Sequence, residues 1–103
     1  MDGVSIYEGW PSDGSNFIDI GGGSRVAWYG DGSGFAEEHY GSDGSRHLGS
    51  VFTSPRFSGL SQWRIEAGEF GKVEGLTLSP SIRCNTEGCL HHGWIRDGRW
   101  VPA

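Results

Sequence analysis

Asp97-Gly98 constrains this chain more than any other feature, because it is a two-residue turn flanked by apolar segments. A type I′ turn needs positive φ at both central positions, and Asp-Gly tolerates this. A hairpin centred there has three predicted pairs: Arg96 with Arg99, Ile95 with Trp100, and Trp94 with Val101. Side chains alternate across a strand. One face therefore carries Ile95 and Trp100, and the other carries Trp94, Val101 and both arginines.

Turn signals also punctuate the rest of the chain. Glycine accounts for 19 of the 103 residues, against a usual ~7%. Asp-Gly-Ser recurs at positions 13, 31 and 43 without the spacing or the closing glutamate of a calcium loop, so we interpret these sites as turns. The segments between turns read as short strands: 4–7, 17–20, 25–29, 47–53, 62–67, 73–78 and 81–83. Residues 35–40 fit either a strand or one helical turn.

The sequence therefore predicts a single domain spanning residues 1–103 and belonging to the all-β class. We expect mainly antiparallel strands, arranged as a small sandwich or partly open barrel of six to eight short strands with a C-terminal hairpin. Residues on apolar alternating faces form the predicted core: Trp28, Trp63, Ile82, Ile95 and Trp100.

The charge distribution is uneven. Residues 1–50 carry eight acids and two arginines, whereas residues 51–103 carry five acids and six bases. A net charge of −5 argues against nucleic-acid binding, which needs a basic surface. No apolar run approaches the ~20 residues of a membrane span, and the acidic N-terminus is no secretory signal. We expect a protein in the host cytoplasm or a virion.

Two cysteines and two histidines lie within nine residues, spaced as metal ligands could be. Cys84, Cys89 and His92 form the predicted zinc-ligand set, with His47 as the fourth ligand; His39 or a water is the alternative. His92 is preferred over His91 because it shares a strand face with Trp94. Two buried thiols and two solvated histidines are the competing interpretation, and a Cys84–Cys89 disulfide is not expected in a reducing compartment.

A partner-binding surface is predicted from charge and exposed aromatic character. Its expected residues are Trp94, Arg96, Arg99, Glu37, Glu38 and Asp43. Arg96 and Arg99 face each other at the hairpin tip, where like charges repel, so a nearby acid or an anionic ligand would stabilise them. Solvated arginines are the alternative.

The last 40 or so residues resemble a family of small proteins encoded by bacteriophages and in bacterial prophage or defence-linked gene clusters. The resemblance is carried by Trp63-Arg64-Ile65, by residues 76–82 (LTLSPSI), by the Cys/His cluster and by residues 92–100 (HGWIRDGRW). It implies a phage-type origin and a zinc site. Family members often carry an extra Cys-rich turn upstream, whereas this chain has no cysteine before Cys84, so His39 or His47 would replace the missing ligands.

The sequence shows no complete set of nucleophile, base and acid. We therefore expect a non-enzymatic phage accessory protein that binds a host or phage protein, with oligomerisation left open. The alternatives are a virion capsid or tail decoration component and a zinc-dependent hydrolase with an open metal position.

Overall fold

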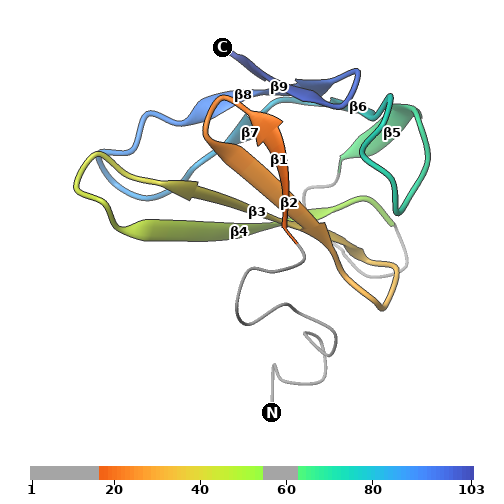
Figure 1. Cartoon of the computed structure of the whole chain (residues 1–103), viewed down its shortest axis with the longest axis horizontal. Helices are drawn as coiled ribbons and strands as arrows, with labels where there is room; N and C mark the ends of the chain where they lie inside the picture. The colour runs from red at the N-terminus through yellow and green to blue at the C-terminus, as the bar shows by residue number, and fades with distance from the viewer. Residues whose placement is uncertain (1–16, 55–62) are drawn as a thin grey trace.

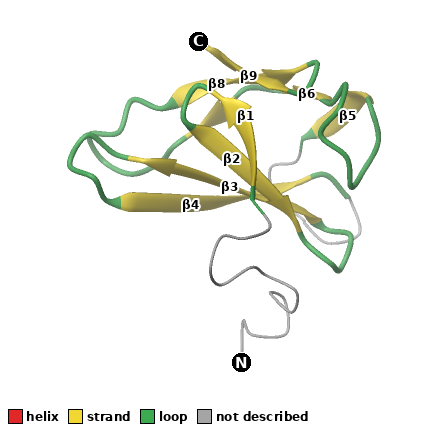
Figure 2. Ribbon diagram, viewed as in Figure 1, coloured by secondary structure: helices red, strands yellow, loops and turns green. Residues whose placement is uncertain are grey.

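The computed structural model describes residues 17–54 and 63–103 (Figure 1). Within them the chain forms nine short strands: β1 (Ile18–Gly21), β2 (Ser24–Trp28), β3 (Gly34–Tyr40), β4 (Arg46–Phe52), β5 (Arg64–Ala67), β6 (Thr77–Ser79), β7 (Ile82–Arg83), β8 (His92–Arg96) and β9 (Arg99–Pro102). These residues contain no helix (Figure 2), and hence none long and apolar enough to cross a membrane. The predicted all-β class is confirmed.

The strands form three antiparallel sheets that do not close into a barrel. Their orders are β1-β2-β3-β4, β5-β6 and β7-β8-β9. In Figure 1 strands β6 to β9 lie across one side of the molecule, opposite β3 and β4. The main apolar core joins the three sheets and contains Ile20, Val26, Phe35, Val51, Leu76, Leu78, Ile82, Ile95 and Trp100.

The C-terminal hairpin has the predicted turn and register. Asp97 and Gly98 adopt φ values of 50° and 76°, and all three predicted pairs are present. Residues at the start of β6 hold the turn in place by hydrogen bonds. The Asp97 amide donates to Thr77 Oγ1 at 2.9 Å, and the Gly98 amide donates to the Leu76 carbonyl at 2.8 Å. Ile82, Ile95 and Trp100 are buried as predicted, whereas Trp28 and Trp63 are only partly buried against the core.

The structure decides one open assignment and shortens one predicted strand. Residues 35–40, which fit either a strand or one helical turn by sequence, form a strand as part of β3. The predicted strand at 73–78 is restricted to Thr77–Ser79, because Gly75 adopts a left-handed φ of 74° that ends extended pairing. The predicted strand at 4–7 lies outside the described residues.

Strand β3 is central in its sheet, and this corrects the predicted acidic face. Glu37 and Glu38 are 3% and 2% exposed, so they cannot line a surface for a partner. Glu38 faces Arg25, which donates at 2.9 Å, and Arg46, which also donates to it. A buried carboxylate is stable only when it is paired, and these arginines supply the pairing.

Trp100→Ala should destabilise the protein by ~3–5 kcal/mol, because it removes a large aromatic side chain from the core. Trp100 is 7% exposed, whereas Leu90 is 93% exposed, which makes Leu90→Ala a control with little expected effect. Chemical denaturation of the three proteins measures the difference. Equal midpoints for Trp100→Ala and wild type would contradict the hairpin's place in the core.

Candidate metal centre and a serine–histidine pair

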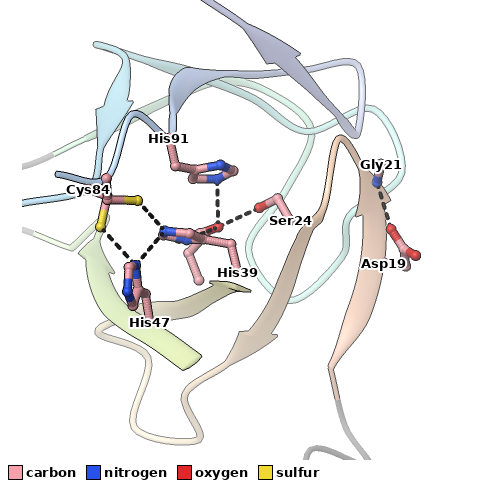
Figure 3. Close-up of polar contacts among 9 residues, drawn as sticks. Asp19, Gly21, Ser24, His39, His47, Cys84 and His91 are labelled. Carbon is pink, nitrogen blue, oxygen red and sulfur yellow. Dashed lines mark hydrogen bonds and ion pairs between the residues drawn. The ribbon is translucent and has the colours of Figure 1, made fainter. Parts of the chain in front are cut away.

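Four side chains from three parts of the chain converge on one point. His39 lies on β3 and His47 on β4, directly opposite each other in the sheet register. Cys84 and Cys89 come from the loop between β7 and β8. Figure 3 shows His39, His47 and Cys84 pointing toward one another. Their ligand atoms, with that of Cys89, all lie within 4.8 Å of one another, so this group could hold a metal ion.

The spacing of these atoms matches a tetrahedral zinc site. Zinc bonds of about 2.3 Å to sulfur and about 2.0–2.1 Å to nitrogen give edges of roughly 3.3 Å between nitrogens and roughly 3.6 Å between nitrogen and sulfur. The distance from His39 Nε2 to His47 Nδ1 is 3.3 Å. Cys89 Sγ lies 3.4 Å from His39 Nε2, and Cys84 Sγ lies 3.6 Å from His47 Nδ1.

Hydrogen bonds outside the cluster fix which nitrogen of each histidine carries the proton. His39 Nδ1 lies 2.9 Å from Glu37 Oε1, an acceptor, so Nδ1 is protonated and Nε2 is bare. Ser45 Oγ donates to Asp43 Oδ1 at 2.7 Å and therefore accepts from His47 Nε2 at 3.1 Å. Two bare nitrogens then face each other, an arrangement that repels unless a cation lies between them.

Glu37 organises one side of this cluster. Besides His39, it accepts from Ser24 Oγ at 2.7 Å and from His91 Nε2 at 3.1 Å, and Figure 3 shows both contacts. The His91 ring stacks between His39, with ring centroids 3.8 Å apart, and Trp100, at 4.3 Å. A buried carboxylate that receives three donors holds the ligand ring in a fixed orientation.

The two thiols differ in acidity. Burial raises the pKa of Cys84, but hydrogen bonds from Thr86 outweigh it, with a smaller contribution from Cys89, and bring the value to about 6. The His91 amide lowers the pKa of Cys89, but desolvation and the neighbouring Cys84 thiolate raise it above its usual value. Burial lowers the pKa of His91. Cys84 is therefore the thiol that ionises first, and thiolate is the form that binds metal.

The predicted ligand set is brought together in part. Cys84, Cys89 and His47 meet, and His39 joins them. His92 does not: its Nε2 lies 2.9 Å from Ser81 Oγ. The reason is strand geometry, because β8 begins at His92 and its alternation turns this side chain away from the loop that carries the cysteines.

The Ser81–His92 pair is a second candidate centre, and sequence reasoning missed it. Both residues are half-buried, and Ser81 immediately precedes β7, the strand paired with β8. Trp63 Nε1 donates to the Ser81 carbonyl at 3.2 Å and fixes its backbone. Eleven positions separate Ser81 from His92, so only the pairing of the two strands brings them together.

The other predicted partner-binding residues lie at the surface. Arg96, Arg99 and Asp43 are exposed and Trp94 is half-buried. Asp43 belongs to the turn before β4, where its carboxylate accepts from the amide and hydroxyl of Ser45. These side-chain hydrogen bonds lower the pKa of Asp43.

The fold and these two centres are those of a small β protein with a metal-ligand cluster and a serine–histidine pair. Residues 44–103 match the family described as bacterial ubiquitination-like system serine protease (BubE). The match covers more than half of the chain, and the chain belongs to this family. It includes Ser81, His92 and three of the four metal-cluster residues. No curated protein and no solved structure matches the chain.

Family membership corrects the functional prediction. A non-enzymatic phage accessory protein, a virion component and a metal-dependent hydrolase were the expected alternatives, and viral and anti-defence roles went with them. These expectations are wrong, because the matching family is one of serine proteases from a bacterial ubiquitination-like system. The sequence showed no complete catalytic set, because the contact between Ser81 and His92 depends on the pairing of β7 with β8.

Replacing Cys89 by serine should remove bound metal, whereas His92→Gln should leave the metal content unchanged. The first change removes a ligand atom from the cluster, and the second alters a side chain bonded to Ser81. Elemental analysis of proteins expressed with added zinc measures both. Loss of metal from His92→Gln, with Cys89→Ser still loaded, would contradict this ligand assignment.

Proposed function

We propose that this protein is a serine protease acting in a bacterial ubiquitination-like system, with Ser81 as nucleophile and His92 as general base. The observation that carries the proposal is the 2.9 Å distance between Ser81 Oγ and His92 Nε2, within the segment that matches the family. A serine hydroxyl is a weak nucleophile until an adjacent base accepts its proton, and this geometry provides that base.

Ser45 is the alternative nucleophile, because it too lies within hydrogen-bonding distance of a histidine, His47. Its hydroxyl, however, already donates to Asp43, and His47 directs its other nitrogen into the metal cluster. His47 Nε2 is thus a donor and not a base. Among the described serines, Ser81 alone faces a histidine that has no part in that cluster.

In the proposed mechanism Ser81 Oγ attacks the carbonyl carbon of the scissile bond while its proton moves to His92 Nε2. His92 then donates this proton to the leaving amine, and the C–N bond breaks to give an acyl-enzyme. A water molecule, deprotonated by His92, attacks the ester and regenerates Ser81. No carboxylate in the described part of the chain is hydrogen-bonded to His92. Within the described residues the proposed catalytic set is therefore a dyad of Ser81 and His92.

The metal in this proposal is zinc, and its role is structural. Two thiolates and two imidazoles form a complete four-ligand set, which leaves no position for a catalytic water. In the loop between β7 and β8, Cys84 lies three residues after Ser81, and Cys89 lies three residues before His92. Holding this loop against β3 and β4 would fix the distance between nucleophile and base.

A fluorophosphonate probe should label Ser81 covalently, since the oxygen of an activated serine attacks the phosphorus of such probes and displaces fluoride, without needing a known substrate. Ser81→Ala should abolish labelling and cleavage, with a loss on the order of 10⁴-fold or more in kcat. His92→Gln should act similarly, and Ser45→Ala serves as the matched control. Intact-protein and peptide mass spectrometry locate the adduct. An unlabelled Ser81 in folded, metal-loaded protein would refute the proposed nucleophile.

Removing zinc with a chelator should lower both the melting temperature and the labelling rate, because metal binding contributes folding free energy to such loops. Re-adding zinc should restore both. Glu37→Gln, which keeps the shape but weakens the orienting hydrogen bond of His39, should reduce metal affinity by ~10–100-fold. A catalytic dyad that works at full rate in metal-free protein would contradict the structural role.

A further inference from the structure

The outer face of the β7–β8–β9 sheet is cationic around the Ser81–His92 pair. Burial alternates along these strands, so the side chains of Ile82 and Ile95 point into the core and Gly93 is buried between them and the neighbouring strand. Arg83, Arg96 and Arg99 are exposed on the other side, which they share with His92 and Trp94. The three strands contain no aspartate or glutamate, so their outer face has one sign of charge.

These arginines differ from the others in the described chain. Arg25 and Arg46 are ion-paired with Glu38, and Arg64 is paired with Glu66. Within residues 17–54 and 63–103, the structure gives no ion pair to Arg83, Arg96 or Arg99. Glu66 lies close enough to Arg96 to feel its charge, but its carboxylate is bound by Ser79 and Arg64.

The arrangement of the three side chains has an energetic cost that a ligand would offset. Arg96 and Arg99 are direct cross-strand partners, and like charges in such positions destabilise a sheet. The Arg96 guanidinium lies over the Trp94 ring, 4.7 Å from its centroid. Stacking orients a guanidinium and leaves its N–H edge free for a carboxylate.

Their positions relative to the dyad specify where an acid would sit. Arg83 is the direct cross-strand partner of His92. Arg96 lies four residues further along β8, a distance of ~13 Å for an extended strand. An extended substrate crossing Ser81 along β8 would place one residue beside Arg83 and another, about four positions away, beside Arg96 and Arg99.

We infer that this arginine face selects substrates whose cleavage site is flanked by acidic residues. The inference rests on the proposed function and specifies its substrate class: an extended, acidic segment of protein. Nucleic acid is the competing anion, but a net charge of −5 and a patch of three arginines beside a serine–histidine pair favour a short acidic peptide.

Binding is measured first on the Ser81→Ala variant, so that the result does not depend on catalysis. Two fluorescein-labelled twelve-residue peptides are compared, one with glutamates at alternate positions and one with glutamines in their place. The glutamate peptide should bind roughly tenfold tighter, because charge-assisted bidentate contacts are the strong ones, and the preference should shrink as salt is raised.

Arg83→Gln and Arg96→Gln should each reduce the glutamate-to-glutamine preference about threefold, and Arg96→Glu should remove it. Lys72→Gln is the matched control, since Lys72 is an exposed cation paired with Glu69 in a loop. In the active protein the arginine substitutions should raise KM for the acidic peptide and leave kcat and fluorophosphonate labelling of Ser81 unchanged.

Equal binding of the two peptides, or a preference untouched by the arginine substitutions, would overturn the inference. Tighter binding of a fifteen-residue oligothymidine than of the glutamate peptide would overturn it in favour of nucleic acid. These outcomes are distinct from failure of the proposed function, which would appear as an unlabelled Ser81 whatever the peptides do.

Discussion

The buried carboxylate of Glu37 is the constraint on which the metal-ligand cluster depends. An ionised carboxylate in the interior is stable only when donors surround it, and Glu37 receives Ser24, His39 and His91. The hydrogen bond from Ser24 links Glu37 to β2, and the one from His39 directs that ring toward the two thiols. The hydrogen bond from His91 links Glu37 to the end of the loop between β7 and β8. One charge therefore joins the four-stranded sheet to the C-terminal sheet and sets the orientation of a metal ligand.

The loop from Cys84 to His91 connects the metal-ligand cluster to the Ser81–His92 pair. This loop connects β7 to β8, and the residues on either side of the connection include Ser81 and His92. Short antiparallel strands are weakly stable by themselves, and β7 contains only two residues. A metal ion held by the cluster would tie this loop to His39 and His47 and would support the short pairing of β7 with β8.

Charge in this protein is arranged by tertiary structure and not by sequence segment. The acidic half of the chain turns two of its glutamates inward, whereas the C-terminal strands carry three exposed arginines on one sheet face. A protein with net charge −5 thus presents a local cationic face. Such local fields can select and orient a charged substrate even when the overall charge would repel it.

The C-terminal hairpin could be predicted from the sequence because it depends on the conformational preferences of neighbouring residues. Asp97-Gly98 sets its own turn type, and the turn then dictates the register of Ile95 with Trp100. The all-β class followed from the same kind of short-range signal. Tertiary structure alone decided that His39 and not His92 joins the cysteines, that Glu37 is buried, and that Ser81 meets His92. Each of these depends on strands that are brought together from distant parts of the chain, and turn chemistry, which acts over a few residues, cannot specify such contacts.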